Sequence, residues 1–324
     1  SNNNVQSLKN IAEDLQIEVV LADITNFIDD YEKRLQTIDD QQTLIDSIND
    51  LFETLYTIKD SNIDATKVKI IESQWSQTEE DVQELAAFIL QAIKTDNQLH
   101  PYLADLLEAL DKGADETNKL SILIPFIVQK LLVSIRDNQL ISSFIYILHK
   151  KGFIQKEDIK FELEKEFQGR PEKSSIGSRS RASESLLIFL PEIFEMNGSD
   201  LDKVLNYFSS SSHNFIKSYF PDKIDKFIQM RDSGEPDDLI AKALRADDVD
   251  TFQSIITKNE TNLVNEVVSY NIFEGYVPNG ETSYINYAAA YGSLKCFKYL
   301  LLNHASINEA TFSFAIFGGN IEIV

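Results

Sequence analysis

The segment at residues 286–305, NYAAAYGSLKCFKYLLLNHA, restricts the possible folds more than any other part of the chain. Ala288 and Ala289 allow a first helix to approach a neighbour closely, and Gly292 permits a sharp reversal of the backbone. The apolar residues between positions 296 and 301 then line one face of a second, antiparallel helix. Two helices this short cannot bury their apolar faces alone, so the segment predicts a unit that stacks on copies of itself.

The sequence contains such copies on both sides of this segment. Residues 247–256 align with residues 292–301, and residues 315–324 align with residues 288–297. The third copy ends within a helix at Val324, which leaves its apolar face without a following repeat. We therefore expect the natural protein to continue with more repeats.

Residues 292–308, GSLKCFKYLLLNHASIN, resemble the ankyrin repeat, whose G-H-L-E-V-V-K-L-L-L-x-x-G-A-D-V-N pattern they follow without a gap. Asn279 and Gly280 stand where that family has a hairpin turn, and His304 stands where it has a glycine in the left-handed conformation. The stretch INYAAAYGSLKCFKYLLLN is similar to a divergent ankyrin subfamily expanded in parasitic protists, whose members carry a helical N-terminal region. The resemblance implies a C-terminal ankyrin-repeat solenoid, truncated at Val324.

The chain also departs from the family pattern. Residues 283–286, SYIN, replace the Thr-Pro-Leu-His opening, so the Thr and His that form hydrogen bonds in the family are missing. Gly292 and Gly319 are 27 residues apart, fewer than the usual 33, which predicts a reduced hairpin between these repeats. Asp247 and Gly292 are 45 residues apart, and we expect the extra length to form a short helix around residues 263–268 and then a loop.

Between residues 5 and 167 the apolar residues recur with the period of a helix. The clearest stripe consists of Val82, Leu85, Ala86, Ile89 and Ile93. Thr78 with Asp81 three residues later predicts an N-terminal cap for that helix. Helices are expected at residues 7–29, 40–59, 64–75, 98–111, 118–135, 138–150 and 155–167. Short polar turns between them predict an antiparallel helical stack.

The sequence RDSGEP at residues 231–236 marks the best domain boundary, because its glycine ends a helix and its proline cannot continue one. We therefore expect an all-α protein with an all-helical N-terminal domain at residues 1–235 and ankyrin repeats at residues 236–324. Gly113 and Gly152 are expected to end helices in the left-handed conformation.

Residues 169–185, GRPEKSSIGSRSRASES, interrupt the helical pattern with small, hydroxyl-bearing and basic residues. This composition predicts a flexible surface loop. Ser183 follows two arginines, as in substrates of basophilic kinases, and we hypothesise that it is phosphorylated, which intact-mass analysis of the native protein tests. Helices are expected to resume at Glu184, and Ser199 is expected to cap a later one.

The charge balance disfavours two classes of partner. With 30 basic and 52 acidic residues the net charge is −22, so attraction to nucleic acid or to an anionic membrane surface is disfavoured. The one cysteine, Cys296, excludes an intrachain disulfide and a CxxC-type zinc site. Residues 1–4 show no secretory leader, and residues 122–135, the longest apolar stretch, are too short and polar for a membrane span. We expect a cytoplasmic (intracellular) protein.

Motifs that carry chemistry are missing from the sequence. The four histidines are scattered, and no HExxH, GxxxxGK[ST] or GxSxG pattern occurs. Adjacent acidic residues are expected in a chain with this many carboxylates and are typical of solvated helix faces. Cys296 falls on the buried face of a repeat helix, where it packs as a core residue. We therefore expect no enzymatic activity, no metal and no cofactor.

The main functional hypothesis is a non-enzymatic scaffold or adaptor that binds protein partners. The ankyrin resemblance implies contacts at hairpin tips and at exposed positions of the first helix, which are Glu281, Ala290 and Tyr291. Tyr291 is the best candidate because an amphipathic ring offers area and a polar group, although it can instead pack against the next repeat.

Two alternatives concern the N-terminal domain. It can be an oligomerisation module, or it can bind a ligand or lipid or act as a cryptic enzyme. A deep cleft with convergent carboxylates of perturbed pKa would support catalysis, whereas its absence leaves binding as the supported role.

Overall fold

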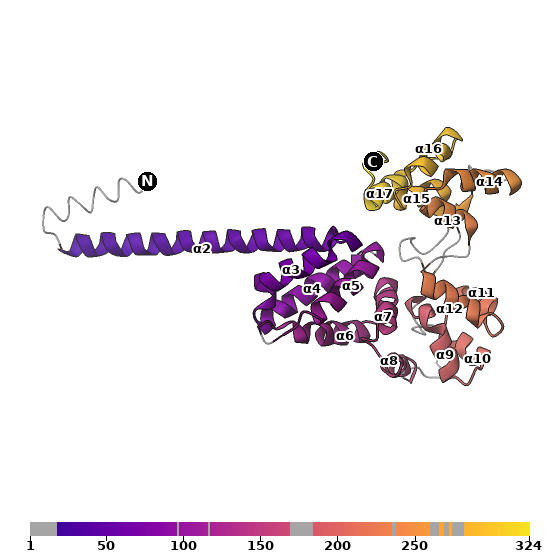
Figure 1. Ribbon diagram of the computed structural model, residues 1–324, viewed down its shortest axis with the longest axis horizontal. Helices are drawn as coiled ribbons and strands as arrows, with labels where there is room; N and C mark the ends of the chain where they lie inside the picture. Colours follow the sequence, from indigo (N-terminus) through magenta and orange to yellow (C-terminus); the bar gives the residue numbers. More distant parts are fainter. Residues whose placement is uncertain are drawn as a thin grey trace, which may run out of the picture. The chain divides into compact units, whose positions relative to one another are not determined.

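The computed structural model describes residues 18–95, 97–115, 117–168, 184–234, 238–259, 266–268, 272–273 and 282–324. By its internal contacts the chain divides into two units, Ser1–Thr57 and Ile58–Val324. The described residues are helical almost throughout, with one small sheet, so the expected all-α class is confirmed (Figure 1). The expected domain boundary at residue 235 falls within the second unit, at a point outside the described residues.

The described part of the first unit is a single helix, α2 (Glu18–Tyr56), which is 39 residues long. The sequence predicts two helices, at residues 7–29 and 40–59, with a break between them. That break is wrong, because the helix continues through residues 30–39, which contain no glycine or proline to end it. Residues 7–17 lie outside the described residues.

The second unit begins with a group of helices that pack on one another. They are α3 (Ile63–Glu72), α4 (Glu79–Thr95), α5 (His100–Asp111), α6 (Leu123–Val133), α7 (Gln139–Lys150), α8 (Lys156–Gln168), α9 (Leu190–Met196), α10 (Leu201–Tyr207), α11 (Ser210–Tyr219) and α12 (Ile224–Ser233). Short 3₁₀ helices lie between them: η1 (Asp60–Asn62), η2 (Gln74–Ser76), η3 (Asn97–Leu99), η4 (Leu120–Ile122) and η5 (Glu184–Phe189). α4 packs against α6 and α7, and α5 packs against α3 and α7.

Local sequence accounts for α4. Thr78 Oγ1 accepts a hydrogen bond from the Asp81 backbone N–H at 3.1 Å, and Asp81 Oδ2 accepts one from the Thr78 N–H at 3.0 Å. This reciprocal cap confirms the predicted helix start. All five residues of the predicted stripe are fully buried, and burial of each large aliphatic side chain stabilises the fold by about 1.5–3 kcal/mol.

Two expected helix ends differ in the structure. Ser199 takes a positive φ of 62°, and Asp200 caps α10 instead, accepting a hydrogen bond from the Lys203 backbone N–H at 3.2 Å. Gly113 is not left-handed. A larger residue at position 113 would lack space, because a Cβ there would lie 2.8 Å from Ile71 Cδ1.

Other helix ends agree with the sequence. Gly152 and Gly234 have φ values of 84° and 64°, as a left-handed C-terminal residue requires. Pro125 lies in the first turn of α6, where its missing N–H has no intrahelical partner to lose.

The rest of the second unit consists of short helices and one pair of strands. These are α13 (Leu239–Arg245), α14 (Val249–Asn259), β1 (Val267–Val268), β2 (Thr282–Ser283), α15 (Tyr284–Ala290), α16 (Leu294–Leu302) and α17 (Glu309–Gly318). β1 pairs antiparallel with β2. The predicted helix at residues 263–268 is therefore wrong for its last two residues, two β-branched valines that favour a strand. The expected hairpin turn at residues 279–280 lies outside the described residues.

The pairs α13–α14 and α15–α16 have the same local structure, 45 residues apart. Asp238 and Ser283 cap their first helices by accepting backbone hydrogen bonds of 2.8 and 3.4 Å. Asp247 and Gly292, which follow those helices, have φ values of 51° and 64°. Gly319 follows α17 with a φ of 65°, so all three aligned positions are left-handed.

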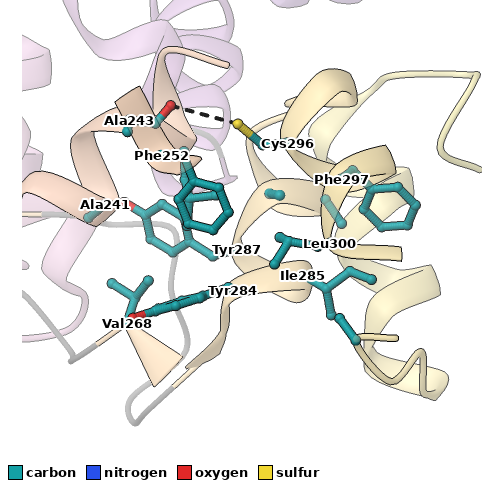
Figure 2. Packing of buried hydrophobic residues seen from close by; sticks show 14 of the residues in the cluster. Ala241, Ala243, Phe252, Val268, Tyr284, Ile285, Tyr287, Cys296, Phe297 and Leu300 are labelled. Carbon is teal, nitrogen blue, oxygen red and sulfur yellow. Dashed lines mark hydrogen bonds between the residues drawn. The ribbon is translucent and has the colours of Figure 1, made fainter. Parts of the chain in front are cut away.

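One apolar cluster joins the two pairs (Figure 2). Phe252 of α14 and Tyr287 of α15 are fully buried, and the ring of Tyr284 meets that of Phe252 edge to face at 5.9 Å. Cys296 Sγ points toward the Ala243 carbonyl oxygen, 4.0 Å away. Helices of this length depend on such packing, since short helices are marginal in isolation.

Gly318 lies where α17 packs closely against α15. A Cβ at this position would lie 2.1 Å from the Ala289 carbonyl oxygen, whereas one at Gly319 would meet nothing within 4 Å. We expect Gly318→Ala to destabilise the protein by about 2 kcal/mol or more, since backbone has to move. Gly319→Ala is the matched control and should cost only about 1–2 kcal/mol of left-handed strain. Equal denaturation midpoints for the two variants would contradict the close approach.

Candidate functional site

A cleft of about 400 Å³ opens in the second unit, among residues from distant parts of its sequence. Its lining includes residues at the start of α5, on α7 and at the end of α12. Arg245 of α13, Phe273 and Tyr291 complete it. The volume lies within the range of small-molecule sites in proteins.

One face of α7 forms a wall of the cleft. Ser143, Tyr146 and Ile147 line it, and their spacing of three and four residues places them on the same side of the helix. The Tyr146 hydroxyl donates a hydrogen bond to Asp232, and Lys150 Nζ lies 3.1 Å from the same carboxylate. These contacts fix the end of α12 against α7.

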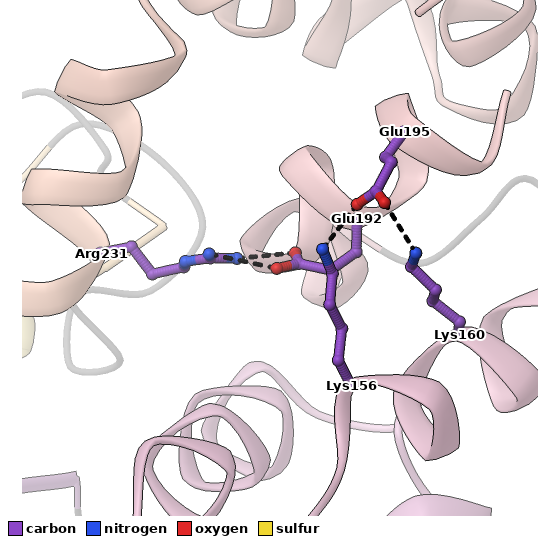
Figure 3. Close-up of polar contacts among 5 residues, drawn as sticks. All are labelled: Lys156, Lys160, Glu192, Glu195 and Arg231. Atoms are coloured by element: carbon purple, nitrogen blue, oxygen red, sulfur yellow. Dashed lines mark hydrogen bonds and ion pairs between the residues drawn. The ribbon is translucent and has the colours of Figure 1, made fainter. Parts of the chain in front are cut away.

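Arg231 is the most constrained charged residue of the cleft (Figure 3). Its Nη1 and Nη2 donate to the two carboxylate oxygens of Glu192 at 2.7 and 3.2 Å, and Nη1 also donates to the Ile188 carbonyl at 2.9 Å. The side chains of Arg231 and Glu192 are only 5% and 9% exposed. The guanidinium carbon lies 4.1 Å from the centre of the Tyr146 ring, in a cation–π contact.

Two buried polar atoms of the lining residues have no hydrogen-bond partner among the described residues. They are Nε of Arg231 and Oγ of Ser143. A buried donor without an acceptor costs about 1–3 kcal/mol. Both atoms are almost inaccessible to a water-sized probe, so they lie behind the surface of the cleft.

The titratable residues of the lining are mixed in sign. Lys151, Arg231 and Arg245 contribute positive charges, against Asp105 and Asp232. Two of these cations are paired with carboxylates, Arg231 with Glu192 and Lys151 with Asp105 and Glu108. Lys151 Nζ is held by Asp105 at 2.5 Å, which positions it at one side of the cleft.

The carboxylate of Asp232, which lines the cleft, has a lowered pKa. Burial opposes ionisation of Asp232, but hydrogen bonds from Tyr146 and Lys150 and the charge of Arg231 outweigh it and lower its pKa. A carboxylate with a lowered pKa is a poor general acid at neutral pH.

His100 also lines the cleft, and its ring is buried. Burial lowers its pKa to about 4, although its Nε2 lies 2.9 Å from the Ile93 carbonyl oxygen, which acts in the opposite direction. At neutral pH His100 is uncharged, and Nε2 is then the protonated nitrogen that donates to Ile93.

Of the three predicted contact residues, one lines the cleft, one is buried and one lies outside the described residues. Tyr291 lines the cleft, with its ring 4.8 Å from that of Tyr287 and 5.1 Å from the Arg245 guanidinium. Ala290 was expected to be exposed. This prediction is wrong, because Ala290, the last residue of α15, is 0% exposed. Glu281 and the proposed phosphorylation site Ser183 lie outside the described residues.

Sequence patterns did not reveal the cleft. Arg231 lies in the stretch interpreted as a domain boundary, and Ser143 lies in an ordinary amphipathic helix. In the sequence, Arg231 is visible only as an arginine at the end of a helix. That position does not identify Glu192, 39 residues away, as its partner.

Cys296 confirms its expected place in the core. It is fully buried, and burial together with the nearby Asp247 carboxylate raises the pKa of its thiol to about 12.

Comparisons with known proteins gave no match for this chain. It matches no protein-family model, and neither curated proteins nor solved structures give a significant match. None of the helices that the structure describes has the length and apolar composition needed to cross a membrane. Within the same residues, no three His, Cys, Asp or Glu side chains gather as metal ligands.

Cys296 should be unreactive in the folded protein. At pH 8 a thiol with a pKa of about 12 is ionised in only about one molecule in ten thousand, and the thiolate is the reactive form. We expect DTNB to label no cysteine in native protein and one per chain in guanidinium. Rapid stoichiometric labelling without denaturant would contradict the burial.

His100 should make the fold sensitive to mild acid. Its pKa is lower in the folded than in the unfolded chain, so the unfolded chain binds the proton first as pH falls. The stability that it contributes is present above about pH 6.5 and is lost toward about pH 4. Between pH 7 and pH 5 the free energy of unfolding should fall by about 2 kcal/mol more in the wild type than in His100→Asn.

Urea denaturation across this pH range measures both slopes. Superimposable slopes for the wild type and His100→Asn would refute the assignment.

Proposed function

We propose that this protein is a non-enzymatic scaffold whose C-terminal helix pairs form an ankyrin-type solenoid that binds protein partners. The observation that carries the proposal is the equivalence of the helix pairs. Asp238 and Ser283 cap corresponding helices, and Asp247, Gly292 and Gly319 are left-handed at the three aligned positions. A recurring unit of this kind is typical of solenoid proteins.

A second observation agrees with the ankyrin pattern. His304 stands where the family has its left-handed glycine, and its φ is 66°. Only a few per cent of non-glycine residues take this conformation, so its occurrence at that position supports the alignment.

Hydrogen bonds between successive units support the stacking. Asp247 accepts from the backbone N–H groups of Lys295 and Cys296 at 3.1 and 2.9 Å, so it caps α16 from the preceding pair. Asn286, which stands at the family's His position, accepts from Thr311 Oγ1 at 2.5 Å. Although Asn286 replaces the histidine of the family motif, it still forms a hydrogen bond to the following helix.

The proposed partner surface includes Tyr291 and the residues next to the paired strands β1 and β2. Tyr291 is half-buried, and aromatic residues with one accessible side are frequent among the residues that dominate protein interfaces. Glu281 directly precedes β2, so the proposal retains it as a contact at the hairpin. A cytoplasmic location agrees with a chain whose one cysteine is a free, buried thiol.

Affinity purification from the source cells tests the proposal, with the complete chain as bait. We expect a specific protein to be retained by the wild type and its recovery to fall tenfold or more with Tyr291→Ala, as at an interface hot spot. Tyr56→Ala, which changes an exposed tyrosine in the first unit, is the matched control and should retain the partner. Recovery of no protein by the wild type would overturn the scaffold, and equal recovery by both variants would overturn the role of Tyr291.

A further inference from the structure

The helix α2 (Glu18–Tyr56) has 39 residues, whereas the next longest helix that the structure describes, α4, has 17 (Figure 1). A helical pattern much longer than about 25 residues is typical of a coiled coil or a membrane span. α2 lacks the apolar composition needed to cross a membrane. Its length therefore favours a coiled coil.

The sequence of α2 follows the seven-residue repeat of a coiled coil from residue 21 to residue 49. In this repeat, written abcdefg, apolar residues stand at positions a and d, so they recur at alternate spacings of three and four. The residues at 21, 24, 28, 31 and 35 are leucine, isoleucine or tyrosine, and Ile38 and Ile45 continue the spacing. Gln42 and Asn49 occupy the two remaining a positions. We call this line of a and d positions the heptad stripe.

The heptad stripe is exposed where the structure describes its side chains. Ile38 and Ile45 are 60% and 50% exposed, and the two polar residues at position a are exposed as well. Another apolar line, at positions c and g, is covered instead, since Leu51 and Leu55 are 3% and 0% exposed. The exposed isoleucines therefore fit a partner helix that repeats with the same period.

A second copy of this chain is a partner whose charges fit. In a parallel pair, each g residue lies beside the e residue of the following repeat on the other helix. Three of the four e positions, at 32, 39 and 46, carry a carboxylate, whereas the g positions, at 27, 34, 41 and 48, carry none. Two parallel copies place Arg34 of each beside Asp39 of the other, and both residues are exposed. An antiparallel pair would bring e positions, and hence carboxylates, against one another.

The polar a positions favour two strands in register. In a parallel coil each a residue meets the same residue of the other helix, so the Asn49 amide can donate to and accept from its own copy. Leucine at position a with isoleucine at position d would by themselves favour larger bundles. However, α2 carries ten acidic residues and two basic ones, and the repulsion between helices grows with their number.

We propose that α2 forms a parallel, in-register, two-stranded coiled coil with α2 of a second copy of this chain. Ile38 and Ile45 of each copy pack against those of the other, and Asn49 pairs with its counterpart. Each assembly then carries two sets of the C-terminal helix pairs. The proposal goes beyond partner binding and does not rest on it, because the contact involves only copies of this chain.

Sedimentation equilibrium of the full-length chain tests the assembly. From about 1 to about 100 µM, the average mass should rise from that of one chain, 36.9 kDa, toward twice that value. Ile45→Asp should raise the dissociation constant at least tenfold, because it places a charge in the buried seam.

Leu44→Asp is the matched control for this variant. It makes the same change at the neighbouring residue, which is 46% exposed and stands at position c, outside the heptad stripe. It should leave the dissociation constant unchanged within about twofold. Far-UV circular dichroism checks that both variants keep the helix content of the wild type.

A cysteine at position 49 tests the parallel register. Mild oxidation of Asn49→Cys should give a covalent dimer on a non-reducing gel, because a positions of two parallel helices in register lie within reach of a disulfide. Asp50→Cys, at the outer position b, is the matched control and should stay uncrosslinked. The native Cys296 is buried and should not contribute.

The proposal is overturned if the chain keeps the mass of a monomer over the whole concentration range, including the case in which it binds the coiled coil of another protein instead. Equal effects of Ile45→Asp and Leu44→Asp on the dissociation constant would place the contact outside the heptad stripe. A dimer without a cross-link at position 49 would refute the parallel register. Because these measurements contain no other protein, their failure leaves the scaffold proposal intact, and failure of the affinity purification leaves this proposal intact.

Discussion

The buried ion pair between Arg231 and Glu192 is the interaction on which the centre of the second unit depends. Both side chains are almost completely buried, and the arginine also donates to the Ile188 carbonyl and lies over the Tyr146 ring. One guanidinium thus connects α12, α9, η5 and α7. Removing either partner of such a pair typically costs about 3–5 kcal/mol, because the other charge is left buried and unpaired. The pair holds these elements in one arrangement at a considerable desolvation cost.

The same side chain connects the fold with the candidate site. Nη1 and Nη2 of Arg231 serve the structure, whereas Nε has no described partner. The neighbouring Tyr146 and Asp232, joined by a hydrogen bond, keep the surrounding helices in place.

Within the C-terminal helix pairs, α16 depends on a different constraint, a cap that the preceding pair supplies. Ser293 begins α16 without a side-chain cap, and Asp247, nearly fifty residues earlier, accepts from two of its first backbone N–H groups. Helices of seven to nine residues gain little from propensity alone, so caps and shared apolar packing decide whether they form. α16 is in this sense completed by the preceding pair.

The sequence by itself determined features that depend on residues close together in the chain. These include the apolar stripe of α4, its Thr78–Asp81 cap and the reversal at Gly292, because period and cap chemistry act over a few residues. Local pattern failed where no glycine or proline decided the outcome, as in the continuous α2. Only the tertiary structure decided that Ala290 is buried, that Arg231 pairs with Glu192 and that Ser143 and Tyr291 line one cleft. Such contacts join residues dozens of positions apart, and they depend on how helices pack, which the spacing within each helix does not specify.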